Sequence, residues 1–287
     1  MKASISYWTI GGFEGAVPVA QAAKTVQELG FDGIELSFGQ GELTPETETG
    51  ALRTLGDAVR AAGVEVSGLC TGAYWGFSLA SPDADERQHA LRFTEAYIRA
   101  ARALGTNAVL VLPGTVDVPW DSGRPVVPAS VVRDLALESL AALLPVAEAE
   151  DVVIALENVW NKFLTGPFEF QSFIESIGSR HVRAYFDVGN VVINGYPEDW
   201  IHVLHGLIER IHVKNFTRRG GAGTLDDFTG SLLVGDVNWE AVFGALRDIR
   251  YDGYLTAEML VTDRGLPDLE LAREVARDLR RLIEQYA

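Results

Sequence analysis

The chain alternates between short apolar runs and longer segments with helical spacing, and the alternation recurs along its whole length. Four junctions are alike: a helical segment stops at glycine or another turn former, and an apolar run follows within a few residues. These junctions read LGFDGIEL, AAGVEVSG, ALGTNAVL and IRYDGYLT, at residues 29–36, 61–68, 103–110 and 249–256. A repeated strand–helix unit predicts parallel strands joined by helical crossovers.

Eight such units can be placed on the sequence. The apolar runs predict strands at residues 3–8, 32–37, 64–70, 107–113, 152–158, 181–188, 207–215 and 253–259. The segments with helical spacing predict helices at residues 17–30, 48–63, 83–105, 128–150, 166–178, 197–207, 238–250 and 266–287. Eight units with right-handed crossovers close most economically as a (β/α)₈ barrel. We therefore predict an α/β TIM barrel that forms a single domain over residues 1–287.

An open, doubly wound sheet is the alternative architecture. It would call for a phosphate-binding G-x-G-x-x-G fingerprint after an early strand, and TIGGFEG at residues 9–15 has the wrong glycine spacing. Length alone would allow two domains, but 287 residues are also usual for one α/β barrel. With 47% hydrophobic residues the chain can bury the core of such a barrel.

The charge and the cysteine content exclude several classes of function. The formal net charge of −16 repels a phosphate backbone, so we expect no nucleic-acid partner. Cys70 is the only cysteine, which rules out an internal disulfide and any multi-cysteine metal site. MKASISYWTIGG, the N-terminal segment, is not apolar enough for a signal peptide or a membrane span. We expect a soluble, cytoplasmic protein without a membrane partner, and homo-oligomerisation is left open.

One metal-capable side chain stands near the end of each of the last four predicted strands: Glu157, Asp187, His212 and Glu258. The carboxyl ends of barrel strands all face one mouth, so these side chains should converge there. Each one alone is better explained as a solvated or capping carboxylate or a core histidine, and it is the shared placement that favours ligands. Two Glu, one Asp and one His suit a single divalent ion such as Mn²⁺, Mg²⁺, Co²⁺ or catalytic Zn²⁺.

Three polar residues near these strand ends are candidates for substrate contacts. Asn190 in DVGN could contact the metal or the substrate, or cap a helix. Lys214 could pair with a site carboxylate or a substrate oxygen. Arg218, in the glycine-rich FTRRGGAG, could bind a substrate hydroxyl or phosphate.

Further candidates follow the early strands. Glu35 ends the second strand and could reach the mouth or pair with a nearby base. Trp8, Tyr74 and Trp75 follow the first and third strands, where aromatic residues either pack the barrel or shield and stack against a sugar. Trp160 is expected to be a packing residue. The glycine-rich segment 217–235 is too long for an ordinary connection and predicts a lid over the mouth.

These motifs, taken in order, resemble the sugar isomerase and epimerase superfamily of xylose-isomerase-like barrels. The resemblance runs nearly end to end and rests on LGFDGIEL, SLASPD, ALEN, FDVGN, HVKN, GDVNW and DGYLTAEM. It implies that Glu157, Asp187, His212 and Glu258 bind one divalent metal. It also implies that the two glutamates flank the sugar and exchange protons with it.

The chain departs from that superfamily at informative places. Many members have a histidine three residues after the strand-six aspartate, whereas this chain has Asn190, as in the branch resembling L-ribulose- and L-xylulose-5-phosphate 3-epimerases. Those phosphate-sugar enzymes tend to have a basic stretch after strand three, where this chain reads GAYWGFSLASPD. The related endonuclease IV needs more histidines than the five present. The nuclease function is thereby excluded.

The sequence therefore predicts a metal-dependent epimerase or isomerase that acts on a small ketose or related polyol through an enediolate, with Glu157 and Glu258 as catalytic residues. A dehydratase acting on a keto-polyol of the inosose type is chemically close. A barrel that only binds a sugar or metal is the non-catalytic alternative. The sequence does not separate epimerisation from isomerisation, and an unphosphorylated sugar is modestly favoured.

Overall fold

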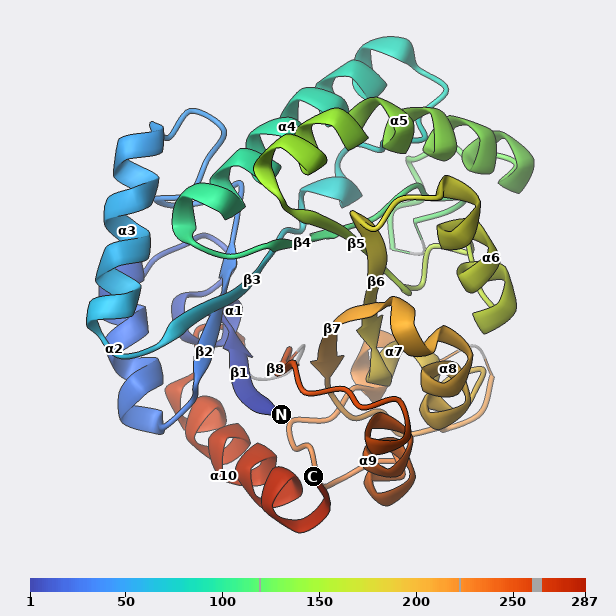
Figure 1. Cartoon of the computed structure of the whole chain (residues 1–287). Helices are drawn as coiled ribbons and strands as arrows, with labels where there is room; N and C mark the ends of the chain where they lie inside the picture. Colours follow the sequence, from blue (N-terminus) through green and yellow to red (C-terminus); the bar gives the residue numbers. More distant parts are fainter. Residues whose placement is uncertain (119, 222, 260–264) are drawn as a thin grey trace.

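Eight parallel strands close into a barrel in which β1 pairs with β8, as predicted (Figure 1). This computed structural model describes residues 1–118, 120–221, 223–259 and 265–287. The strands are β1 Lys2–Ser6, β2 Gly33–Ser37, β3 Glu65–Cys70, β4 Ala108–Val111, β5 Val153–Glu157, β6 Val182–Asp187, β7 Ile208–Val213 and β8 Tyr254–Ala257.

Helices surround the barrel and link successive strands (Figure 1). The outer helices are α2 Val19–Leu29, α3 Thr49–Ala61, α4 Ala84–Leu104, α5 Ala129–Glu150, α6 Pro167–Ile177, α8 Pro197–Leu204, α9 Trp239–Asp248 and α10 Leu269–Tyr286. Short helices occupy some connections: α1 Tyr7–Gly11, α7 Val188–Val191, and the 3₁₀ turns η1 Ala73–Trp75, η2 His205–Leu207 and η3 Leu225–Asp227. None of the helices in the described ranges is long and apolar enough to cross a membrane.

The recurring junctions of the sequence end helices in the way their residues require. Gly30 and Gly105 follow α2 and α4 with φ of 80° and 90°, a left-handed conformation that glycine adopts without steric cost. The next strand begins within three residues in each case. Each helix then packs its apolar stripe on the barrel, as α10 does with Leu271, Val275 and Leu279, all buried at helical spacing.

Two predicted strands are too long because a helix begins where the strand was expected to continue. The first strand, predicted at residues 3–8, ends at Ser6, whose hydroxyl accepts a hydrogen bond from the Trp8 amide and caps α1. The sixth strand, predicted at 181–188, ends at Asp187, whose carboxylate caps α7. In both cases a local side-chain cap terminates an apolar run that has the pattern of a strand.

Candidate active site

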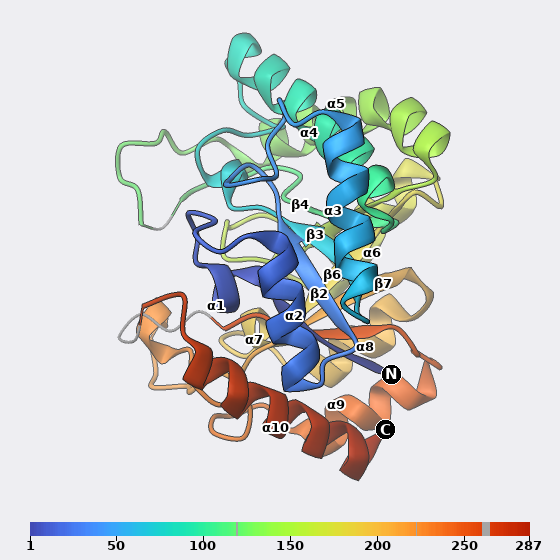
Figure 2. The ribbon, with the colours of Figure 1, turned by 90° about the vertical axis from the view of Figure 1, so that its left-hand side faces the viewer.

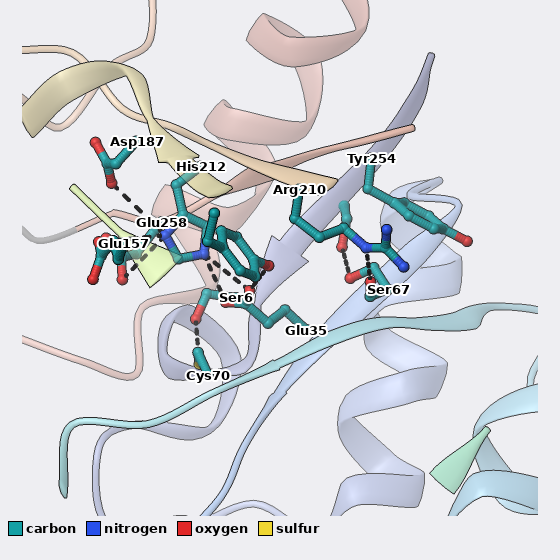
Figure 3. Close-up of polar contacts among 12 residues, drawn as sticks. Ser6, Glu35, Ser67, Cys70, Glu157, Asp187, Arg210, His212, Tyr254 and Glu258 are labelled. Atoms are coloured by element: carbon teal, nitrogen blue, oxygen red, sulfur yellow. Dashed lines mark hydrogen bonds and ion pairs between the residues drawn. The ribbon is translucent and has the colours of Figure 1, made fainter. Parts of the chain in front are cut away.

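The four predicted ligand residues meet at the carboxyl end of the barrel. Glu157 and Asp187 are the last residues of β5 and β6, His212 lies one residue before the end of β7, and Glu258 directly follows β8. One ligand-capable atom from each lies within 4.8 Å of the other three, and all four residues are buried. Figure 3 shows His212 between Glu35 on one side and Asp187, Glu157 and Glu258 on the other.

Strand register and one asparagine position the carboxylates. Asp187 lies opposite His212 in the β6–β7 pairing, so the two residues share a level of the barrel. Asn158 accepts a hydrogen bond from the Asp187 amide at 2.8 Å and donates one to its carbonyl at 2.8 Å. These bonds join the ends of β5 and β6, and through them the backbones that carry Glu157 and Asp187.

The imidazole of His212 presents one nitrogen to the carboxylates. Its Nδ1 lies 3.7 Å from oxygens of Asp187 and Glu258 and 4.0 Å from one of Glu157. Within the described part of the chain this buried nitrogen has no hydrogen-bond partner. An unpartnered imidazole nitrogen among three carboxylates, within 4.8 Å of one another, fits the donor set of one divalent cation.

Lys214 and Asn190 complete the polar cluster. The Lys214 ammonium lies 2.6 Å from Asp187 Oδ2 and also pairs with Glu258. Asn190 donates its backbone amide to Asp187 Oδ1 at 2.8 Å and its side-chain amide to Glu157 Oε1 at 3.3 Å. Asn190 therefore lies beside the predicted ligands, and it does not cap a helix, because Asp187 is the N-cap of α7 and Asn190 lies within that helix.

Burial and crowding of charges shift the ionisation of these groups. Burial, with the nearby Glu258 charge, raises the pKa of Glu157 to about 8. Burial alone would lower the pKa of Lys214, but Asp187 and Glu258 outweigh it and raise that pKa. Burial would likewise raise the pKa of Asp187, but the Lys214 charge outweighs it and lowers that pKa. Crowded carboxylates held by one ammonium form a site that a divalent cation would stabilise.

A cavity of about 260 Å³ borders the cluster. Glu157, Glu258, Lys214 and Asn190 supply its polar side chains together with Thr71. The rest of its wall is mostly apolar: Trp8, Phe13, Trp75, Leu110, Leu112, Trp120, Val159, Trp160, Leu225 and Phe228. A second hollow of about 510 Å³ adjoins it and shares Val159, Trp160 and Asn190 with it.

The structure distinguishes among the predicted substrate contacts. Trp8 and Trp75 line the cavity, with the Trp8 indole nitrogen donating to Ser37 Oγ at 2.8 Å. Tyr74 does not line it, because its side chain is fully buried and its hydroxyl pairs with Thr94 Oγ1 at 2.8 Å. Tyr74 therefore has the packing placement that was the alternative for it.

Arg218 does not line the cavity. Its guanidinium donates to the carbonyls of Val192 at 2.6 Å and Gly195 at 2.9 Å, and it lies 5.0 Å from the ring centre of Tyr196. In this arrangement the guanidinium braces the segment after α7, and the predicted contact to a substrate hydroxyl or phosphate is not formed at this cavity.

Of the two placements open to Glu35, the structure has the pairing with a nearby base, and the side chain does not reach the mouth of the barrel. Its carboxylate is fully buried in the barrel interior, where it contacts His212 Nε2 at 2.9 and 3.0 Å. Tyr185 also donates its hydroxyl to Glu35. Because β2 has Gly33, Glu35 and Ser37 on one face, Glu35 points inward one level below the mouth.

The glycine-rich segment after β7 contributes directly to the cavity. Leu225 and Phe228 line the cavity. Phe228 also forms an isolated antiparallel bridge with Phe216, the residue just before the segment. Residue 222 lies outside the described residues. The segment therefore covers part of the mouth, and its movement as a lid stays a prediction.

A family model described as "Xylose isomerase-like TIM barrel" matches residues 23–284. The chain belongs to the xylose-isomerase-like TIM barrel family. The SgbU protein of Escherichia coli (strain K12), provisionally named an L-ribulose-5-phosphate 3-epimerase, is 26% identical over 250 residues, which is 85% of each chain.

Solved structures with the same fold align with nearly the whole chain. A D-psicose 3-epimerase crystallised with D-fructose is 20% identical and has a TM-score of 0.77, with 99% of this chain and 98% of that one covered. An L-ribulose 3-epimerase is also 20% identical with a TM-score of 0.77, with 99% and 95% covered. At these identities the likeness shows the fold.

Sequence reasoning missed several residues that shape the site in this member of the xylose-isomerase-like family. Trp160, expected only to pack, lines both cavities and donates its indole N–H to the Asn190 carbonyl at 2.9 Å. Trp120, Phe13 and Phe228 also line the cavity. Asn158, which joins the ends of β5 and β6, was also missed. Its position directly after Glu157 in ALEN was the one available signal, because an amide beside a predicted ligand is well placed to hold a neighbouring strand.

Proposed function

We propose that this protein is a metal-dependent epimerase or isomerase that moves a proton on a small ketose through an enediolate. One observation carries the proposal: Glu157 and Glu258 both line the same cavity while lying among the atoms of one metal-type cluster. They come from β5 and from the residue after β8, so they reach the cavity from different sides. Two proton-transfer groups facing one small cavity are what epimerisation uses.

In the proposed reaction one glutamate removes the proton from the carbon next to the substrate carbonyl, and the other returns a proton to the opposite face. Return to the neighbouring carbon would instead isomerise the sugar. A divalent cation held by Glu157, Asp187, His212 and Glu258 would supply positive charge that stabilises the enediolate oxygens. Lys214 lines the cavity and adds a second positive charge beside them.

The cavity wall supports this chemistry by keeping water away. Trp8, Trp75 and Trp160 place apolar ring surface around the polar floor. Such surface packs against the C–H face of a sugar and lowers the local polarity, which strengthens every charge interaction at the floor. The names of the relatives, 3-epimerases of D-psicose, L-ribulose and L-ribulose 5-phosphate, support C3 epimerisation over aldose–ketose isomerisation.

Solvent-hydrogen exchange tests the proposal directly. The metal-loaded protein should incorporate deuterium at one carbon of its ketose in deuterated water and produce an epimer. Glu157→Gln and Glu258→Gln should each lower epimerisation by roughly 10²–10⁴-fold, because the amide keeps the shape but removes the base. A Glu258→Gln variant that holds metal and turns over normally would overturn the two-glutamate mechanism. Sugar binding without exchange would indicate the non-catalytic barrel.

Metal binding by the four residues has its own test. Elemental analysis and calorimetric titration should give one divalent ion per chain. An Asp187→Ala/His212→Ala double variant that stays folded should lose it. Unchanged metal content in this variant would refute the ligand assignment. The same titration, repeated with Mn²⁺, Mg²⁺, Co²⁺ and Zn²⁺, identifies the preferred metal.

We further propose that the substrate is an unphosphorylated sugar. Among the described residues that line the cavity, Lys214 is the only basic one, and it is already paired with Asp187 and Glu258. The net charge of −16 also disfavours anions at long range. Comparison of kcat/KM for matched free and phosphorylated ketoses decides the point, and a preference for phosphate beyond about 100-fold would reverse it.

A further inference from the structure

We propose that Glu35 is a positioning residue for the metal site, which fixes the His212 imidazole so that Nδ1 faces the three carboxylates. The inference rests on the proposed metal role of His212 and goes beyond it, since Glu35 itself touches neither the cavity nor the other ligand residues. It assigns a function to a fully buried carboxylate that the proposed reaction does not use.

The geometry around His212 separates its two nitrogens. Nε2 lies 2.9 and 3.0 Å from the two Glu35 oxygens, so Nε2 carries a proton and donates it to Glu35. Nδ1, on the opposite side of the ring, lies 3.7 Å from Asp187 and Glu258 (Figure 3). With Nε2 holding a proton, Nδ1 is the nitrogen whose lone pair can bind a cation.

The Glu35 carboxylate also faces side chains from two other strands. Tyr185 of β6 donates its hydroxyl to Glu35, and the Cys70 side chain of β3 lies beside it. The Tyr185 ring also packs against the imidazole, with 4.6 Å between ring centres. Gly68 leaves room for this arrangement, because a Cβ there would lie 3.1 Å from the Tyr185 hydroxyl.

A structural role alone accounts poorly for this arrangement. Burying a carboxylate is costly, and an apolar residue of similar size would pack the interior of a barrel with less loss. The carboxylate also contacts the imidazole with both oxygens, an arrangement that resists rotation of the ring. A histidine held by an outer carboxylate is a recurrent device at metal sites, where the outer group sets the orientation and basicity of the ligand.

Metal affinity, measured without any sugar, tests the role. Glu35→Gln removes the negative charge and Glu35→Leu also removes the acceptor. We expect Co²⁺ to bind about 10–100-fold more weakly to Glu35→Gln than to the wild type by calorimetry, and more weakly still to Glu35→Leu. The visible d–d absorption of the Co²⁺-loaded protein should also change in shape, because a loosened imidazole alters the ligand field.

Tyr185→Phe is the matched control. It alters the same buried network and keeps the ring packing, but leaves the contact between Glu35 and His212 intact. We expect its Co²⁺ affinity to stay within about 3-fold of wild type, with an unchanged absorption spectrum. Thermal denaturation of each metal-free variant establishes that it is folded before titration.

The outcomes separate this inference from the proposed function. A folded Glu35→Gln variant with wild-type Co²⁺ affinity and spectrum would overturn the positioning role while leaving the metal site intact. Equal losses in Glu35→Gln and Tyr185→Phe would also overturn it, because general disturbance of the interior would then explain both. A wild-type protein that binds no divalent metal would refute the metal site itself.

Discussion

At the scale of single residues, the site is a balance of buried charge. Asp187, Glu157 and Glu258 each place one carboxylate oxygen within 4.8 Å of those of the other two. Lys214 is buried beside them and pairs with Asp187 and Glu258. Without a metal ion, this ammonium is the main group that offsets their repulsion, since His212 Nδ1 lies 3.7 Å or more from each carboxylate.

Replacement of Lys214 should therefore expose that repulsion. Lys214→Met keeps much of the side-chain volume but leaves buried carboxylates without their partner, which costs about 3–5 kcal/mol in comparable buried pairs. We expect the metal-free variant to lose stability in urea denaturation, and added metal to restore more stability than it adds to the wild type. Equal metal-induced stabilisation of the two proteins would contradict this charge balance.

At the scale of elements, the one-turn helix α7 lies against β7 so closely that a side chain is excluded. A Cβ on Gly189 would lie 2.4 Å from the Lys214 Cγ and 3.1 Å from the Lys214 carbonyl oxygen. Asp187 is the N-cap of this helix and Asn190 lies within it. The packing of α7 against β7 therefore sets the positions of both residues relative to Lys214. Glycine at this position therefore serves close packing of the site.

Gly189→Ala should push α7 and β7 apart. We expect a loss of about 1–3 kcal/mol in unfolding free energy from overpacking, together with weaker metal binding. Gly50→Ala is the control, because nothing lies within 4 Å of its added Cβ in α3. That change should be neutral or stabilise the protein by up to about 1 kcal/mol through helix propensity. Wild-type stability and affinity in Gly189→Ala would disprove the packing argument.

At the scale of the whole molecule, the proposed ligands connect one side of the barrel. They come from β5, β6 and β7 and from the residue after β8, and β8 closes the barrel on β1. Figure 2 shows the termini at the end of the barrel opposite the long loops that follow β4 and β7. A bound ion would therefore hold together the strand ends at the mouth, which is the end of the barrel opposite the termini.

Removal of metal should lower the thermal stability of the barrel. An ion present at about 100 times its Kd stabilises a native protein by about 2.7 kcal/mol when it does not bind the unfolded chain. For a chain of this size we expect a chelator to lower Tm by roughly 5 °C. Differential scanning calorimetry with and without chelator measures the shift. The Asp187→Ala/His212→Ala variant should show none, and an equal shift there would place the ion elsewhere.

Much of this architecture could be predicted from the chain itself. Apolar runs alternating with helical segments, punctuated by turn formers such as Gly30 and Gly105, indicated a closed eight-unit barrel, and the pairing of β1 with β8 confirms it. The family model confirms the resemblance. These features are local and periodic, so each is written in a short stretch of sequence. Convergence of Glu157, Asp187, His212 and Glu258 followed from topology, because parallel strands share one mouth.

The direction of individual side chains was decided by the tertiary structure. Glu35 and Tyr185 lie 150 residues apart, and their pairing depends on which residues face inward at the same level of the closed barrel. Arg218 and Trp160 likewise took roles set by neighbours from other loops. Periodicity identifies an element and its ends, but the stagger of strands around a barrel fixes which distant side chains meet, and that stagger has no local signature.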